Sequence, residues 1–164
     1  MADQQREELA PENPRIEIRK SERTLTLFDG DRVLRIYRIG LGSQPVGDKE
    51  KEGDGRTPEG DFRIFVKNPN SRFFLSVGLN YPLPEDAERG LVSGVISQEE
   101  RDAIVEAHES NSAPPQKTPL GGEIYIHGHG SGSDWTEGCV ALDDDEMREL
   151  FGAVSVGTPV RILP

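Results

Sequence analysis

A chain of 164 residues has the length of a single domain and can bury a hydrophobic core. Its 19 Lys and Arg residues against 30 Asp and Glu residues give a formal charge of −11, which opposes nonspecific binding to nucleic-acid phosphates and anionic lipid. We therefore expect no nucleic-acid partner. No apolar stretch approaches the roughly 20 residues of a membrane-spanning helix, so we also expect no membrane span in this chain.

The start of the chain differs in composition from the rest. Residues 1–14 are polar and acidic and contain two prolines, which is typical of a disordered lead-in or linker. A folded domain is expected over residues 15–164. Its first strands are indicated by alternating apolar residues at 16–18 and 25–27 and by the β-branched and aromatic run 33–39. Asp29-Gly30 between the second and third runs predicts a hairpin turn.

The middle of the chain begins with a loop and then returns to strand patterns. Residues 40–60 are dense in glycine, proline and charge, which indicates a loop. Further strands are predicted from short apolar runs at 62–66, 73–77, 124–126 and 160–162. The sequence therefore predicts a mainly β protein.

Two helices are also predicted. Ser97 and Glu100 have the spacing of a capping box, inside an irregular excursion from residue 80 to residue 116 that we expect to cover a cleft as a lid. The second helix is expected to start near Asp143, whose spacing to Glu146 suits a cap. Its core-facing stripe is Met147, Leu150, Phe151 and Val154.

Cys139 is the single cysteine, so neither an internal disulfide nor a site with several thiolate ligands can form within the chain. One interpretation of a lone cysteine is a small buried apolar residue with no chemical role. As a nucleophile it needs a base, because the pKa of a free thiol is about 8.5. His127 and His129 are the candidate bases close in sequence, in the stretch I-Y-I-H-G-H-G-S-G-S-D-W-T-E-G-C-V-A-L.

Glycines surround both candidate catalytic side chains. Gly128 follows the first histidine and Gly138 precedes the cysteine, and backbone amides on either side of Cys139 could form an oxyanion hole. The same pattern also fits a glycine-rich turn with two exposed histidines, and spacing alone does not separate the two interpretations.

Metal binding is a further alternative. His127, His129, Asp134 and Cys139 could chelate a metal ion, but their spacing matches no common zinc framework. Acidic residues between positions 48 and 59 have the offsets of a calcium loop, yet their flanks are β-patterned and Pro58 intervenes. We expect a solvated charged loop there, no metal site and no cofactor.

Two separated motifs resemble those of the L,D-transpeptidases of the bacterial envelope. Ile126-His127-Gly128 followed by Thr136-Glu137-Gly138-Cys139 is similar to the family's strand ending in His-Gly and its Ser/Thr-x-Gly-Cys. Residues 53–62, G-D-G-R-T-P-E-G-D-F, are similar to its Gly-x-x-x-Thr-Pro-x-Gly-x-Phe/Tyr segment. The resemblance extends over residues 15–164.

The resemblance implies a β-sandwich-like catalytic domain with a few short helices. Cys139 would attack the third-residue carbonyl of a peptidoglycan tetrapeptide stem and release D-alanine, with His127 as base and Gly128 orienting it through its carbonyl. An amine acceptor makes the protein a transpeptidase, and water makes it a carboxypeptidase or hydrolase. It also implies a periplasmic or envelope location, and we expect a monomer. A noncatalytic wall-binding module and an unrelated cysteine hydrolase remain alternatives.

Several residues around the motifs bear on the substrate. Arg56 and Thr57 are candidates to meet a stem-peptide carboxylate or to support the loop base. Trp135, Thr136 and His129 are expected near the pocket, with packing under the loop the preferred role for the tryptophan. The sequence departs from the family in three ways: Glu137 replaces a histidine, Ala141 replaces an arginine or asparagine, and the loop before the cysteine is short.

Overall fold

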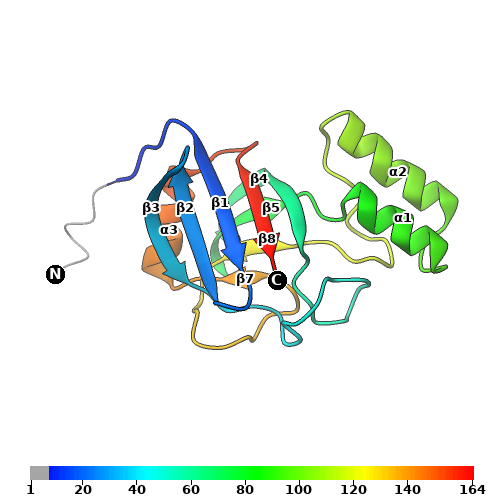
Figure 1. The fold of residues 1–164 in the computed structure, drawn as a ribbon, viewed down its shortest axis with the longest axis horizontal. Coiled ribbons are helices and arrows are strands. Elements are labelled where there is room, and N and C mark those ends of the chain that lie inside the picture. Colours follow the sequence, from blue (N-terminus) through cyan, green and yellow to red (C-terminus); the bar gives the residue numbers. More distant parts are fainter. Residues whose placement is uncertain (1–7) are drawn as a thin grey trace.

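The computed structural model describes residues 8–164, which form eight strands and three short helices (Figure 1). The strands are β1 Pro14–Arg19, β2 Thr24–Asp29, β3 Arg32–Arg38, β4 Gly60–Ser71, β5 Phe74–Leu79, β6 Tyr125–His127, β7 Val140–Ala141 and β8 Pro159–Leu163. The helices are α1 Pro84–Val92, α2 Gln98–Glu109 and α3 Asp144–Ala153. The prediction of a mainly β protein is confirmed.

The first three strands form from the alternation seen in the sequence. In β1 and β2, Ile16 lies opposite Leu27 and Ile18 opposite Leu25, and all four are buried. Alternate side chains of a strand point to opposite faces, so this pattern gives the pair one apolar face. The predicted hairpin between β2 and β3 is present, with Gly30 at φ +60° where a left-handed residue is needed.

The sheet has the strand order β3-β2-β1-β8-β4-β5-β6-β7, and β4 makes it curl. The first residues of this long strand pair with β8, and its remainder pairs with β5. The two halves of the curled sheet then enclose one core, to which Phe62, Leu79 and Val160 contribute. This is the β-sandwich-like arrangement that was expected. Helix α3 packs against it through Met147 and Leu150.

Both predicted helices start where the sequence indicated, and one of the two predicted side-chain caps is present. Ser97 and Glu100 form the predicted capping box of α2. Asp143 is the N-cap of α3 but makes no side-chain cap, since its carboxylate accepts from the amide and hydroxyl of Ser131 instead. Helix α1 was not predicted.

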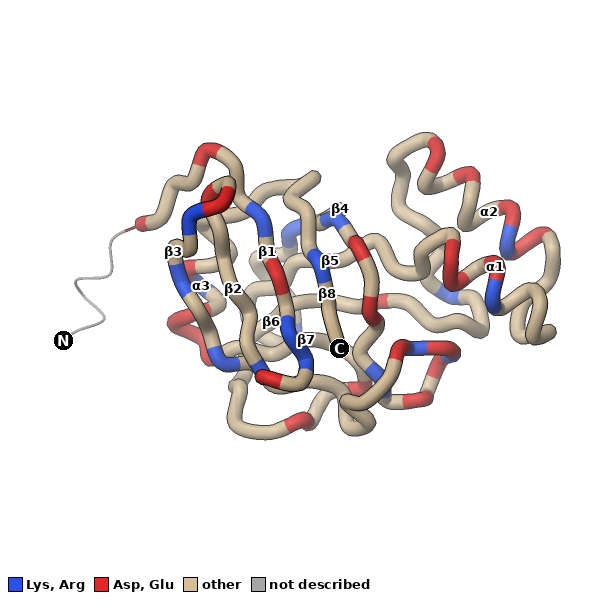
Figure 2. The backbone as a smooth tube through the Cα atoms, in the orientation of Figure 1, with Lys and Arg blue, Asp and Glu red and all other residues tan. Residues whose placement is uncertain are grey.

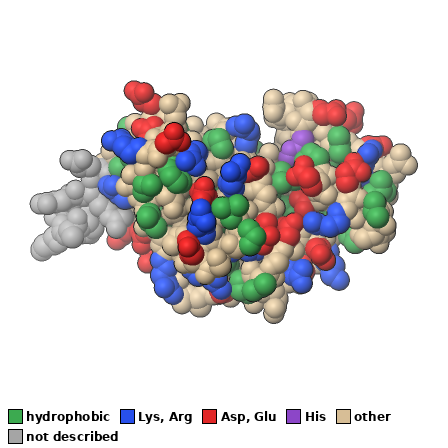
Figure 3. All heavy atoms as spheres, viewed as in Figure 1, with side chains coloured by type: hydrophobic (Ala, Val, Ile, Leu, Met, Phe, Trp, Pro, Cys, Tyr) green, Lys and Arg blue, Asp and Glu red, His purple; other side chains and the backbone are tan. Residues whose placement is uncertain are grey.

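Helices α1 and α2 form a hairpin that projects from one side of the sheet (Figure 1). They pack on each other around a second, small core made by Ala87, Ile96, Ile104 and Leu120. Acidic residues outnumber basic ones along both helices, whereas the two signs are interspersed over the strands (Figures 2 and 3). The hairpin is therefore a separate acidic lobe attached to the β body.

The ends of the predicted segments differ slightly from the structure. Strand β1 begins at Pro14, and Leu9 already packs against the core, so the ordered region reaches into the predicted lead-in. Residues 1–7 of that lead-in lie outside the described residues. Among residues 8–164, no helix combines the length and apolar character needed to cross a bilayer.

Candidate active site

Strand pairing brings Cys139 and His127 to one place. Strands β6 and β7 are parallel, with His127 opposite Ala141 and Ile126 opposite Val140. Cys139 directly precedes β7, and its Sγ accepts a hydrogen bond of 3.4 Å from the amide of Tyr125. Register partners share a face of a sheet and residues two apart on an extended chain do so as well. The cysteine therefore belongs to the same edge and face as the histidine.

His127 is buried, and its ring is held by the next residue. Its Nδ1 lies 2.7 Å from the carbonyl oxygen of Gly128. A carbonyl only accepts, so Nδ1 carries the proton and Nε2 of the neutral ring is left as the basic nitrogen. Burial lowers the pKa of His127, with a smaller contribution in the same direction from His129. A neutral imidazole is the form that can take a proton.

The Cys139 thiol is half-buried and bonded to the backbone. Besides the bond from Tyr125, Sγ donates to the carbonyl oxygen of Glu123 at 3.4 Å. Burial raises the pKa of Cys139 to about 11, and the carboxylates of Glu123 and Glu137 act in the same direction, against the Tyr125 amide and the Lys49 ammonium. The resting nucleophile is therefore a thiol near neutral pH and ionises only if a base removes its proton.

Aromatic side chains form a wall around His127. The Phe73 ring, in the turn between β4 and β5, stacks on the imidazole with centroids 4.6 Å apart and planes at 23°. Trp135 meets both rings edge-on, at 5.5 Å from His127 and 5.6 Å from Phe73. Its Nε1 donates to the Gly130 carbonyl at 2.9 Å while 39% of the residue stays exposed. Trp135 thus packs under the loop and also reaches the surface.

His129 lies at the outer edge of this wall. It is exposed, meets Phe73 edge-on at 5.8 Å, and has φ +78°. Its amide donates to the carboxylate of Asp144 at 2.8 Å, which fixes the loop on the start of α3.

Thr136 and Gly138 shape the turn that presents the cysteine. The Thr136 hydroxyl donates to the Cys139 carbonyl at 2.7 Å and accepts from the Gly138 amide at 3.1 Å. Gly138 has φ +148°, and a Cβ there would lie 2.9 Å from the carbonyl oxygen of Arg56. Thr136 is buried and its hydroxyl is engaged within the turn, and its contact with substrate stays a prediction. The Gly138 amide is likewise engaged within the turn.

The two residues predicted to meet a carboxylate lie in different settings. Thr57 has no exposed surface, and its Oγ1 accepts from the Gly42 amide while its carbonyl accepts from Lys20. These bonds agree with the second of its two expected roles, support of the loop base. Arg56 is half-buried, with its guanidinium 3.4 Å from the Asp48 carbonyl.

The charged loop between residues 48 and 54 is held by its own carboxylates. Asp54 accepts from the Lys49 ammonium at 2.9 Å and from the amides of Glu50, Lys51 and Arg56. Asp134, a candidate metal ligand, is paired with Arg23 at 2.9 Å. Within residues 8–164, no three metal-ligating side chains gather at one point.

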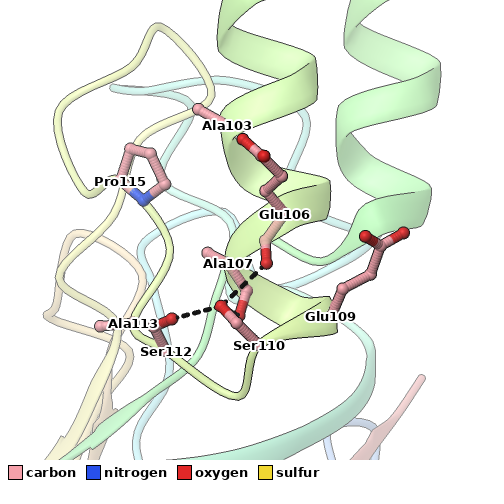
Figure 4. Close-up of a pocket in the computed structure, with 8 residues that line it drawn as sticks. All are labelled: Ala103, Glu106, Ala107, Glu109, Ser110, Ser112, Ala113 and Pro115. Carbon is pink, nitrogen blue, oxygen red and sulfur yellow. Dashed lines mark hydrogen bonds between the residues drawn. The ribbon is translucent and has the colours of Figure 1, made fainter.

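A shallow hollow of about 700 Å³ lies between α2 and the chain that follows it (Figure 4). Its lining comes from Ala103, Glu106, Ala107, Glu109, Ser110, Ser112, Ala113 and Pro115. The hollow is open and lined by small and acidic side chains, and it shares no residue with the cysteine site.

Comparison with known proteins decides between the families that such a cysteine and histidine could belong to. The model of the L,D-transpeptidase catalytic domain, YkuD, matches residues 13–162. The chain belongs to the L,D-transpeptidase catalytic domain family. A curated relative is the putative L,D-transpeptidase YafK of Escherichia coli K12, 31% identical over 81 residues. That match covers 46% of this chain and 33% of the relative, so the chain matches only a third of the relative's length.

Solved L,D-transpeptidase folds are also similar. Pgp2, the helical cell shape determining protein of Campylobacter jejuni, gives a TM-score of 0.60 at 19% identity, covering 93% of this chain and 48% of that chain. The L,D-transpeptidase of Xylanimonas cellulosilytica gives a TM-score of 0.54 at 18% identity, covering 93% of this chain and 61% of that chain. Bd1075 of Bdellovibrio bacteriovorus gives a TM-score of 0.59 at 20% identity, covering 94% of this chain and 51% of that chain. At these identities the likeness concerns the fold.

Proposed function

We propose that this L,D-transpeptidase family member is a cysteine acyltransferase acting on peptidoglycan stem peptides in the periplasm or cell envelope. The observation that carries the proposal is the bond of 2.7 Å between His127 Nδ1 and the Gly128 carbonyl. It leaves Nε2 as a base on the sheet edge and face to which Cys139 belongs. A neutral base and a protonated thiol are the reactants of a proton transfer.

The reaction follows from these two groups. His127 takes the thiol proton as Sγ forms a bond with the third-residue carbonyl carbon of a tetrapeptide stem. The C–N bond to the terminal D-alanine then breaks, and its amine leaves with the proton from His127. A thioester of Cys139 remains. An amine acceptor attacks it, forms a new amide and returns the proton to sulfur through His127; water in its place gives the free tripeptide stem.

The surrounding groups have supporting roles in this proposal. The amide of Cys139 supplies the oxyanion donor, because the Gly138 amide is bonded to Thr136. Phe73 and Trp135 hold the imidazole plane, and Arg56, His129 and the exposed part of Trp135 line the approach of the stem peptide.

Product analysis tests the proposal. Disaccharide-tetrapeptide is incubated with the protein and with Cys139→Ala, and the products are identified by mass spectrometry. Loss of D-alanine only with the intact thiol supports the acyl-enzyme reaction, with cross-linked dimers indicating an amine acceptor and tripeptides indicating water. If neither protein changes the substrate while a known family enzyme does, the proposal fails, and binding to peptidoglycan without turnover would then support a wall-binding module.

A further inference from the structure

The side chain of Gln116 links the segment that holds the resting thiol to Tyr81 and Pro114, which lie just before and just after the acidic helical hairpin. Its Oε1 accepts from the Glu123 amide at 2.7 Å, and its Nε2 donates to the carbonyl of Tyr81 at 2.8 Å and of Pro114 at 3.0 Å. Glu123 in turn accepts the S–H of Cys139. A continuous series of hydrogen bonds therefore runs from Tyr81, where the excursion leaves the sheet, to the nucleophile.

The backbone around Glu123 needs this support. Glu123 has φ +55°, a left-handed conformation that a residue with a Cβ rarely adopts without help. The chain also passes very close to Gln116 here, because a Cβ on Gly122 would lie 2.2 Å from the Gln116 carbonyl oxygen. The side chain of Gln116 thus accepts the hydrogen bond from the backbone amide of Glu123, the residue in the left-handed conformation.

Tyr81 fixes the other side of the same segment. It is fully buried, its hydroxyl donates to the Leu120 carbonyl at 2.6 Å, and its own carbonyl receives the Gln116 amide. Two of its polar atoms therefore hold two points of the segment from residue 116 to residue 120. The Glu123 amide and the Leu120 carbonyl are therefore both held from the base of the hairpin, on the segment that presents the Glu123 carbonyl to the thiol.

We propose that Gln116 is a positioning residue that acts through Glu123 to hold the Cys139 thiol in its protonated resting orientation. This inference rests on the proposed function for its catalytic meaning, since it makes the base of the helical excursion a support for the nucleophile. An S–H that donates to a fixed carbonyl is stabilised as a thiol, and its release frees sulfur to ionise. Gln116 touches no reacting atom.

The test uses alkylation of the protein by iodoacetamide as a function of pH. Because Cys139 is the single cysteine, the rate reports its ionisation without any need for turnover. Gln116→Met keeps the length of the side chain but removes both hydrogen-bonding groups. Gln116→Glu keeps an oxygen for the Glu123 amide and adds negative charge. Tyr37→Phe is the control, because it removes one buried hydrogen bond, to Glu149, far from this segment.

The proposal expects Gln116→Met to be alkylated roughly three- to tenfold faster at a given pH, the equivalent of one lost hydrogen bond. Gln116→Glu, which keeps the acceptor for the Glu123 amide, should be alkylated more slowly than Gln116→Met, and Tyr37→Phe should match the unmodified protein. Equal rates for Gln116→Met and the unmodified protein would overturn the inference, as would an equal acceleration by Tyr37→Phe. If the unmodified protein shows no turnover, the proposed function fails while this experiment still decides the role of Gln116.

Discussion

The Phe73 ring lies flat on the His127 imidazole, with centroids 4.6 Å apart and planes at 23°. Phe73 comes from the turn before β5 and His127 from the end of β6, and the antiparallel pairing of these two strands brings them together. Phe73 also receives the Gly128 amide on its carbonyl at 2.9 Å, so one residue contacts both the base and the glycine that orients it. We infer that Phe73 fixes the orientation of the imidazole ring and excludes water from it.

Replacing Phe73 by leucine should therefore reduce kcat/KM by about tenfold, because a displaced base loses much of its effect. Water reaching the imidazole would raise the pKa of His127 from its lowered value toward the ordinary one. Since the unprotonated ring is the base, the acidic limb of the kcat/KM profile should move to higher pH. Phe28→Leu is the control. It truncates a phenylalanine of β2 that stacks on the Arg15 guanidinium, and it should leave kcat/KM and its pH profile unchanged.

Gly128 should not tolerate a side chain. A Cβ there would lie 2.5 Å from the Asp144 carboxylate and 3.0 Å from the Phe73 carbonyl. We expect Gly128→Ala to lower the free energy of unfolding by about 1–3 kcal/mol and to remove most activity. Gly132→Ala is the control in the same loop, because its Cβ would meet nothing within 4 Å. Urea unfolding and turnover of both variants check this, and equal stability for the two would contradict it.

The pH dependence of the thiol gives another prediction. With a pKa of about 11, the alkylation rate of Cys139 should rise about tenfold per pH unit from neutral pH toward that value. Glu137→Gln removes one charge that opposes ionisation and should shift the profile to lower pH. Glu109→Gln on α2 should not shift it. A profile of the unmodified protein that levels off near pH 8.5 would contradict the raised pKa.

The same shift affects stability with a definite sign. A group whose pKa is raised in the folded state contributes stability at low pH, and that contribution is lost as pH rises from the ordinary thiol pKa through about 11. Cys139→Ser should therefore flatten the fall in the free energy of unfolding over that range. Urea unfolding at several alkaline pH values measures the difference, and parallel curves would count against it.

Lys49 should stabilise both the loop and the thiolate. Its buried ammonium lies 2.9 Å from the Asp54 carboxylate, which also accepts three backbone amides. Lys49→Met should lower the free energy of unfolding by about 3 kcal/mol, because it leaves a largely buried carboxylate without its cation, and should slow alkylation of Cys139. Lys51→Met, at an exposed position of the same loop, should do neither.

Much of the fold could be predicted because local patterns determine it. The alternation in β1 and β2, the Asp29-Gly30 turn and the Ser97 capping box all depend on residues close in sequence. Helix α1 was missed because Leu83, a residue without a capping side chain, precedes it between two prolines. Strand β7 was missed because two residues carry no periodicity.

The sequence predicted the site residues that lie close together in the chain, but not the contacts that distant residues make with them. The sequence placed His127, Gly128 and Cys139 together as candidates, and the structure joins them through the β6–β7 pair. It could not indicate Phe73, whose ring reaches His127 only because β5 pairs with β6, a strand about 50 residues further along the chain. Nor could it show that the Thr57 and Thr136 hydroxyls are used by the backbone, since either residue type also suits a substrate contact.

The most direct test of the central claim is the mass of the intact protein after brief incubation with disaccharide-tetrapeptide and acid quenching. The account predicts an added mass equal to the donor less D-alanine, located on Cys139, removed by hydroxylamine as a thioester is, and absent from Cys139→Ala. Release of D-alanine by Cys139→Ala at the rate of the unmodified protein would show that the reaction does not pass through Cys139 and would contradict the account.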